Sequence, residues 1–462
     1  MSNTSLEELR TKEFGRLDSN GHVYLDYTGG GLYPESPLKQ YFQFLQNQVL
    51  GNPHSRSPAS ILSTDLVEDT RSETLRFFNA DEDEYDLIFT QNATAALKLV
   101  GESYPFNGES RFVATSDNHN SVLGIREFAK ARGAKIDHVP LNRELRVTEL
   151  ESFLPKNHGR NQNLFAYPAQ SNFSGVQHPL NWIELAHTNG YDVILDAAAF
   201  VPTNKLDLGL VHPDFVCLSF YKMFGFPTGV GALIASKRSL GKLVRPWFSG
   251  GTIDYVSVKN QVHVLAKGSR KYEDGTLNYL GVPAVGIGLN FLKKVGMENI
   301  HSHVNALTQD LLFRLSELKH TNGNQLIRIY GPETTASRGG IIAFNVHDVD
   351  EKVIDFGVVE EATIEDNISI RAGCFCNPGA AEYAFDHPPA LAKDCYDKAT
   401  CDLFDIERFE ECMADRPIGA IRASLGIASN ARDLSRLIGS LETFRNSHVN
   451  QFSKSKLLAH AC

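Results

Sequence analysis

The chain has 462 residues, of which 42% are hydrophobic and 22% charged, a composition typical of a globular protein with a large core. Its 45 basic and 55 acidic residues give a net charge of −10, which argues against nucleic acid or an anionic membrane as the main partner. The first residues lack the basic-then-apolar pattern of a signal peptide, and no apolar run approaches the roughly 20 residues of a membrane helix. We therefore expect a cytoplasmic protein with no membrane partner.

Strand and helix patterns alternate from about residue 86 to residue 235, which predicts an α/β fold with a mostly parallel sheet. The first expected strand covers 86–90 and runs into an alanine- and leucine-rich helix over 91–100. A strand that enters a helix through small polar residues leaves backbone N–H groups free for an anion, and Asn92 and Thr94 add polar side chains. An ordinary helix cap would give the same pattern.

Three later strands are also followed by, or end in, a residue that could bind a ligand or take part in a reaction. The strand over 111–115 is followed by His119, which could lie flat on a ligand ring or simply be solvated. The strand over 191–196 ends in Asp196, which could hold a cationic ring nitrogen or cap a turn. The strand over 214–219 is followed at once by Lys222 and then by a glycine- and proline-rich loop. An amine at the tip of a buried strand is costly unless it is paired or used covalently.

All four positions follow the carboxyl end of a strand, which is the edge where ligands bind in open α/β sheets. An anion site, a flat imidazole, a carboxylate and an amine in that order suit pyridoxal phosphate, which needs a lysine for its Schiff base and an anion beside its ring nitrogen. The pattern favours a pyridoxal phosphate site centred on Lys222 and Asp196.

Beyond residue 282 the pattern changes to a long helix and shorter amphipathic elements, which predicts a smaller α+β domain. We divide the chain into an N-terminal segment (1–30) that packs on the small domain, a large domain (31–289) and a small C-terminal domain (290–462). The small domain would contain a cysteine loop (371–380) and a polar surface insertion (381–416).

Seven cysteines, an odd number in a chain this long, do not suggest a disulfide framework. Cys374 and Cys376 allow three interpretations: metal ligands, two inert or redox-coupled cysteines, or a nucleophile on a flexible loop. The metal site would have to recruit Cys395, Cys401 and Cys412. Their spacings match no zinc pattern, so we favour the nucleophile. Cys217, inside an apolar strand, is expected to be a small buried hydrophobic residue.

The chain resembles class V aminotransferase-fold, pyridoxal phosphate-dependent enzymes of the cysteine desulfurase group, most closely the amino-terminal desulfurase-like domain of molybdenum cofactor sulfurase. The motifs that carry this resemblance run nearly end to end: Tyr-Leu-Asp-Tyr-Thr-Gly-Gly at 24–30, Gly-Asn-Pro-His-Ser at 51–55, Tyr-Pro-Ala-Gln-Ser-Asn-Phe-Ser-Gly at 167–175, the lysine segment at 219–229, Arg-Ala-Gly-Cys-Phe-Cys-Asn-Pro-Gly-Ala at 371–380 and Arg-Ala-Ser-Leu-Gly at 422–426. It implies fold type I, with a mostly parallel seven-stranded sheet in the large domain.

The resemblance also implies how the cofactor is held. Lys222 matches the lysine that binds it covalently, Asp196 the partner of the pyridine nitrogen, and His119 the histidine stacked on the ring. Asn172 matches an asparagine near the phenolic oxygen. The phosphate contacts match Ala93, Thr94 and Ser219, with Thr276 reaching across from a partner subunit. One position departs from related desulfurases, because Ala199 stands where they have glutamine.

The substrate side of the site is implied in the same way. Arg422 matches the arginine that clamps the substrate carboxylate, a role that its fixed fork of donors suits. Cys376 falls on the reactive position of the loop, and Cys374 does not. Arg371, five residues before Cys376, could favour its thiolate or help to bind substrate.

The implied activity is that of a homodimeric cysteine desulfurase, which converts L-cysteine to L-alanine and leaves a persulfide on Cys376. Lys222 would remove the α-proton. The implied sulfur acceptor is the molybdenum cofactor or a separate acceptor protein. Because sulfurases usually carry a further carboxy-terminal domain, either another protein supplies that domain or the acceptor differs. Two alternatives stay open: a pyridoxal phosphate-dependent lyase or decarboxylase of the same fold in specialised metabolism, and a non-catalytic protein that holds the cofactor as a structural ligand.

Overall fold

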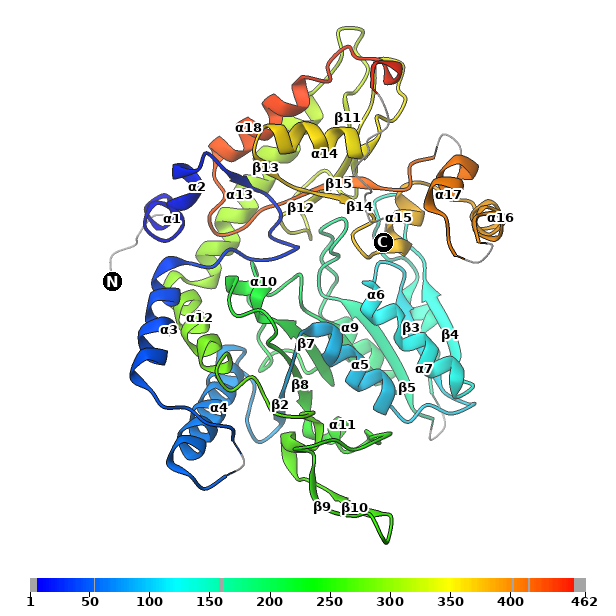
Figure 1. The fold of residues 1–462 in the computed structure, drawn as a ribbon. Coiled ribbons are helices and arrows are strands. Elements are labelled where there is room, and N and C mark those ends of the chain that lie inside the picture. Colours follow the sequence, from blue (N-terminus) through cyan, green and yellow to red (C-terminus); the bar gives the residue numbers. More distant parts are fainter. Residues whose placement is uncertain (1–5, 54, 158–160, 401–402, 414–415, 453–462) are drawn as a thin grey trace.

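The computed structural model describes residues 6–53, 55–157, 161–400, 403–413 and 416–452. Its largest unit is a seven-stranded sheet with the order β2-β8-β7-β6-β5-β3-β4 (Figure 1). The strands are β2 (Tyr85–Thr90), β3 (Arg111–Thr115), β4 (Lys135–Val139), β5 (Asn163–Pro168), β6 (Tyr191–Asp196), β7 (Phe215–Ser219) and β8 (Gly231–Ser236). Strands β4, β3, β5, β6 and β7 are parallel, and only β8 runs antiparallel to its two neighbours. The prediction of a mostly parallel α/β sheet is confirmed.

The sheet is buried on both faces, as expected for parallel strands connected by helices. Successive residues of β3 show this, since Phe112 and Ala114 belong to one apolar cluster and Val113 to another. The helices around this sheet are α4 (Pro58–Phe77), α5 (Ala93–Ser103), α6 (Asn120–Leu123), α7 (Ile125–Ala131), α8 (Leu150–Phe153), α9 (Trp182–Thr188), α11 (Lys237–Leu240) and α12 (Val282–Val295). Because helices cover both faces of the sheet, the edge formed by the ends of its strands remains open.

A second sheet of four antiparallel strands has the order β11-β12-β15-β14. Its strands and the elements around it are α13 (Met297–Glu317), β11 (Ile327–Tyr330), β12 (Ile341–Val346), α14 (Phe356–Glu365), β13 (Ile368–Ser369), β14 (Arg371–Gly373), α15 (Pro378–Ala384), α16 (Pro389–Ala399), α17 (Ile406–Met413), β15 (Ala420–Ser424), α18 (Ala431–Glu442) and η2 (Val449–Gln451). The sheet agrees with the predicted change to α+β, while the domain limits at 30 and 289 stay a prediction.

The N-terminal segment lies against this second sheet. It contains α1 (Leu6–Phe14), α2 (Arg16–Ser19) and β1 (Val23–Tyr24), followed by α3 (Glu35–Asn47). Strand β1 pairs in parallel with β13, and Asp26 forms an isolated bridge with Ser424 at the end of β15. The motif at 24–30 is therefore held beside Arg422, almost 400 residues away in the sequence.

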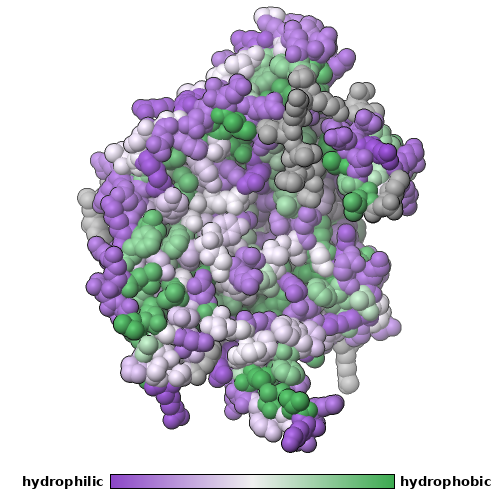
Figure 2. All heavy atoms as spheres, in the orientation of Figure 1, coloured by the Kyte–Doolittle hydropathy of each residue, from purple (hydrophilic) through white to green (hydrophobic). Residues whose placement is uncertain are grey.

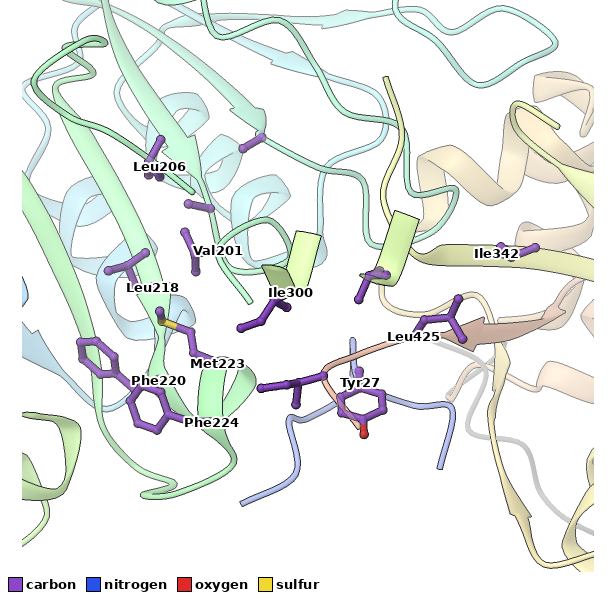
Figure 3. Packing of buried hydrophobic residues seen from close by; sticks show 14 of the residues in the cluster. Tyr27, Val201, Leu206, Leu218, Phe220, Met223, Phe224, Ile300, Ile342 and Leu425 are labelled. Atoms are coloured by element: carbon purple, nitrogen blue, oxygen red, sulfur yellow. The ribbon is translucent and has the colours of Figure 1, made fainter. Parts of the chain in front are cut away.

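Lys222 lies in a one-turn helix, α10 (Phe220–Phe224), and not at the start of a loop as the sequence suggested. Figure 3 shows why this turn forms: Phe220, Met223 and Phe224 all enter the same apolar cluster as Leu218. Gly225 ends the helix at a φ of 76°, where a Cβ would lie 2.3 Å from the backbone nitrogen of Tyr33. The packing of three of its five side chains fixes the direction of Lys222.

Two regions project from this body in Figure 1. One is the hairpin of β9 (Ile253–Ser257) and β10 (Val262–Leu265), which precedes the turn η1 (Gly268–Tyr272). The other consists of α16 and α17, which pack on each other within the predicted insertion. None of the described helices is both long and apolar enough to cross a membrane.

The expectation that the cysteines form no disulfides is wrong. Cys395 of α16 and Cys412 of α17 are joined by a disulfide, and Cys374 is disulfide-bonded as well. These sulfurs are thereby unavailable as metal ligands, and Cys401 lies outside the described residues. The Cys395–Cys412 bond could not be predicted from the sequence, because only the folded helix pair brings the two Cα atoms to 5.4 Å. Cys217 is fully buried, as predicted.

Candidate active site

A cavity with a volume of about 120 Å³ opens at the carboxyl ends of the parallel strands. Its wall includes residues from every strand end that the sequence singled out. They are Asn92, Ala93, Thr94, His119, Asn172, Asp196, Ser219 and Lys222. The sheet topology thus assembles the predicted cofactor residues in one place, as open α/β sheets do at this edge.

Lys222 enters the cavity from α10, where its side chain is largely enclosed. Burial lowers the pKa of the Lys222 amine below its ordinary value, and the nearby Asp196 carboxylate acts in the opposite direction. A lowered pKa increases the neutral fraction of the amine, which is the form that acts as a nucleophile or base.

Asp196 and His119 lie on the same cavity wall as the amine. Asp196 is buried and accepts a hydrogen bond from the Ala198 N–H through Oδ1 (3.0 Å), which fixes its carboxylate. The Nδ1 atom of His119 accepts from the Ser121 N–H at 3.1 Å, so the neutral imidazole carries its proton on Nε2. Burial lowers the pKa of His119, which keeps this ring neutral near pH 7.

The opposite end of the cavity is built for an anion. Helix α5 begins there, and Asn92 caps it by accepting from the Ala95 N–H at 2.9 Å. The Ala93 N–H donates to Ser219 Oγ at 2.9 Å, and the hydroxyl of Thr94 lies 2.7 Å from that of Ser121. These hydroxyls and the positive end of α5 form the type of cradle that binds phosphate. The side-chain oxygen of Asn92 is already used in this cap, because it accepts the hydrogen bond from Ala95.

Arg422 lies on β15 and is almost entirely buried. Its guanidinium donates to the Asn172 carbonyl and to Asp26 Oδ1, both at 3.0 Å, while its Nε is buried without a hydrogen-bond partner among the described residues. A buried donor left unpaired is costly. A planar carboxylate suits the remaining edge of the fork.

The cysteine loop is tied to the cavity through Asn172. The Asn172 amide donates to the Phe375 carbonyl at 2.7 Å and accepts from Asn377 Nδ2 at 2.8 Å. The Phe375 ring packs 4.8 Å from the Arg422 guanidinium. Phe375 and Cys376 both have left-handed backbones, with φ values of 59° and 54°. Such conformations cost about 1–3 kcal/mol each for non-glycine residues and mark functional sites.

Cys376 is the exposed free cysteine of this loop, whereas Cys374 is buried and disulfide-bonded. Its carbonyl accepts a hydrogen bond from the Asn120 N–H, so its backbone is held next to the start of α6. The two cysteines that the sequence could not separate by exposure are therefore different in the structure.

Four predicted site residues are not among those that line the cavity: Arg422, Cys376, Thr276 and Arg371. Thr276 is exposed and lines a neighbouring groove that also contacts Asn92. Its hydroxyl accepts from Asn52 at 3.4 Å. Arg371 is half-exposed and forms an ion pair with Asp26 at 2.6 Å.

Sequence reasoning missed two polar residues. Asp26 joins Arg371 and Arg422 through one carboxylate, and only its place in the Leu-Asp-Tyr motif hinted at a role. Gln170 is buried in the cavity wall, and its amide donates to the Ala199 carbonyl at 2.9 Å. A glutamine thus does lie beside Ala199, although it comes from the end of β5.

The fold and the strand-edge cavity define an α/β protein whose ligand site lies at the carboxyl ends of a mostly parallel sheet. The aminotransferase class-V family model matches residues 23–437. The chain belongs to that family.

Known proteins resemble the chain over most of its length. A molybdenum cofactor sulfurase of Drosophila ananassae is 36% identical over 485 aligned residues, covering 96% of this chain and 60% of the relative. The chain spans 50 to 60% of the length of the curated relatives of this name that it matches. The apo structure of a cysteine desulfurase from Thermococcus onnurineus NA1 has a TM-score of 0.79 at 22% identity, covering 96% and 98% of the two chains. A cystine C–S lyase in complex with cysteine persulfide has a TM-score of 0.69 at 18% identity, covering 94% and 100%.

Proposed function

We propose that the protein is a pyridoxal phosphate-dependent cysteine desulfurase that converts L-cysteine to L-alanine and retains the sulfur as a persulfide on Cys376. The observation that carries this proposal is the connection of two sites by Asn172. This residue lines the Lys222 cavity and holds the loop of the exposed Cys376. The names of the relatives, molybdenum cofactor sulfurase and cysteine desulfurase, support the same activity.

The cavity fits the cofactor in both charge and donors. Lys222 would bind it covalently, Asp196 would face its ring nitrogen, and His119 would cover its ring. Ala93, Thr94 and Ser219 would hold the phosphate at the start of α5. When bound, pyridoxal phosphate supplies a ring that withdraws electrons from the α-carbon of an amino acid.

The protein residues divide the remaining work. Arg422 would receive the substrate carboxylate on its unpaired edge. Lys222 would take the α-proton and later return a proton to carbon, because its lowered pKa favours the neutral amine. His119, with its proton on Nε2, is a further proton donor on the same wall. The Cys376 thiolate would attack the substrate sulfur, so that a sulfur–sulfur bond forms and the carbon–sulfur bond breaks. The electron pair of the broken bond would stay on the substrate β-carbon, which would take a proton from His119 or Lys222 and become the methyl group of alanine.

The sulfur acceptor is proposed from the relatives. Because the curated relatives are molybdenum cofactor sulfurases, we propose that the persulfide sulfur passes to the molybdenum cofactor or to an acceptor protein. The exposure of Cys376 is compatible with transfer to an external acceptor.

We propose that the active form is a homodimer assembled around the projecting hairpin. Figure 2 shows apolar side chains gathered at the lower edge, over this region. The exposed apolar residues are Val244, Trp247, Phe248, Tyr255, Val256, Val258, Val262 and Val264. A patch of this kind is typical of an interface between subunits. Thr276 follows the hairpin and is exposed, as a residue that reaches a partner's phosphate would be.

Product analysis after incubation with L-cysteine tests the activity. We expect alanine in amounts equal to the persulfide, or to the sulfide when a reductant is present. The fold does not decide this outcome, since a cystine C–S lyase shares it. Pyruvate with ammonia would show a lyase, carbon dioxide would show a decarboxylase, and either result would overturn the proposal. Sedimentation of the cofactor-loaded protein tests the dimer, and an active monomer would contradict it.

A further inference from the structure

Two arginines on neighbouring strands share one acidic side chain. Arg371 of β14 is directly opposite Arg422 of β15 in the antiparallel register, so their side chains leave the same face of the sheet. Asp26 lies between them. Its Oδ2 is 2.6 Å from Arg371 Nη2, and its Oδ1 is 3.0 Å from Arg422 Nη2.

The two arginines together form a site for anions, and the Asp26 carboxylate already occupies one half of it. Two guanidinium groups on one face could hold two carboxylates bidentately. Asp26 is buried, and Gly29 lies so close to it that a Cβ at this glycine would be 2.5 Å from Oδ2 of the carboxylate. The Nε of Arg422 has no hydrogen-bond partner among the described residues, so this edge of the guanidinium remains for the carboxylate of a ligand.

The occupied half lies beside the place proposed for the substrate carboxylate, because Asp26 Oδ1 is 3.0 Å from Arg422 Nη2. The cysteine loop is close as well, since the Phe375 ring packs 4.8 Å from the Arg422 guanidinium. A ligand whose carboxylate binds Arg422 would therefore lie within the field of the Asp26 carboxylate.

We infer that Asp26 determines substrate specificity by admitting amino acids with a single carboxylate and excluding those with a second acidic group. The inference rests on the proposed function, because it assigns the substrate carboxylate to Arg422. Asp26 neutralises Arg371, which would otherwise attract a second anion, and it repels an acidic side chain. A neutral thiol meets no such repulsion.

Asp26→Asn tests this role with almost no change of shape. The cofactor-loaded protein is titrated with L-alanine and with L-aspartate, and the cofactor absorbance reports binding. The native protein should bind L-alanine more tightly. In the variant, the affinity ratio should move at least about tenfold toward L-aspartate, as the loss of one repulsive charge and the release of one arginine predict. An unchanged ratio, or an equal loss for both ligands, would overturn the inference.

Two further variants locate the effect. Asp26→Asn combined with Arg371→Gln should lose the gain toward L-aspartate, because the released guanidinium is gone. Asp18→Asn is the matched control, since Asp18 also pairs with a buried arginine of the same chain at 2.9 Å but lies outside the site. Its ratio should stay at the native value. Arg371→Gln alone removes one of the two cations that pair with Asp26 and should move the ratio further toward L-alanine, and this variant decides the matter if Asp26→Asn does not fold.

A measurement without cofactor separates this inference from the proposed function. Thermal unfolding of the cofactor-free protein is followed with succinate and with acetate. Asp26→Asn should gain stabilisation by succinate over acetate, and the native protein should not. If the cofactor-loaded native protein does not bind L-alanine, the proposed function fails. The succinate experiment still supports or overturns the role of Asp26 in that case.

Discussion

The two halves of the candidate site, here called the Lys222 end and the Cys376 end, are built in different ways. At the Lys222 end, each functional side chain follows a strand of one sheet and is fixed by the core beneath it. At the Cys376 end, an exposed cysteine lies on a loop with two left-handed residues that are held by Asn172 and by the buried Phe375 ring. The first end is rigid because of packing, and the second is held in place by a few polar contacts.

This difference suits two chemical tasks. Proton transfer at a carbon atom needs a base at a fixed place, and the enclosed Lys222 provides it. Sulfur transfer needs a nucleophile that reaches the substrate and then an acceptor, which an exposed loop cysteine allows. Four experiments test whether the two ends have these separate tasks.

Lys222→Ala should have the largest effect. The variant loses both the covalent attachment of the cofactor and the base, so alanine formation should fall by at least about a thousandfold. Borohydride reduction should no longer fix the cofactor to the chain. Lys98→Ala, on the solvent side of α5 with 69% of its side chain exposed, is the control and should retain activity. A borohydride-stable adduct in Lys222→Ala would contradict the assignment.

Cys376→Ser should abolish alanine formation and leave the cofactor in place. The reason is that the loop end supplies only the sulfur nucleophile, whereas the strand ends hold the cofactor. Cys374→Ser should instead lower stability, because loss of a disulfide typically costs about 2–4 kcal/mol, and should keep substantial turnover. Normal alanine production by Cys376→Ser would show that another group accepts the sulfur.

Asn377→Ala should have a moderate effect confined to the loop. Asn377 donates to Asn172 Oδ1 and to the Asp117 carbonyl, and it caps α15 through the Ala380 N–H. Loss of these bonds should destabilise the ordered conformation of the loop by about 1–3 kcal/mol and reduce kcat several-fold. The spectrum of the bound cofactor should not change. A loss of cofactor as large as the loss of kcat would mean that the two ends are not separable.

The pH dependence should show the smallest effect. Burial lowers the pKa of His119, so the neutral ring persists below the pH at which a free histidine gains its proton. The acidic limb of kcat/KM that reports this ring should therefore lie below pH 6.5, the ordinary histidine value. His119→Gln should remove that limb. A limb at or above the ordinary value would place His119 in a solvated or acid-paired setting.

The sequence predicted which residues come together at the Lys222 end, because this information is local. Each strand pattern was followed by its functional residue, and parallel strands must place their carboxyl ends on one edge, so Asp196 and Lys222 had to meet. The short helix around Lys222 was missed, because the packing that forms it involves residues far away in the sequence.

The Cys376 end was predicted only in part. The family register chose Cys376 over Cys374, and the structure distinguishes them by exposure and by a disulfide that no spacing rule indicated. The pairing of Asp26 with Arg422 spans almost 400 residues, and such a contact leaves no periodic signal in the sequence. Contacts between distant segments therefore decide this end of the site.

Sulfur should pass from a substrate held over Lys222 to Cys376. The most direct test is a single turnover with one equivalent of L-cysteine, followed by mass spectrometry of the cysteine-containing peptides and by measurement of alanine. We expect one added sulfur on the Cys376 peptide for each alanine formed. Alanine or pyruvate released with free sulfide, and no added sulfur on Cys376, would contradict the account.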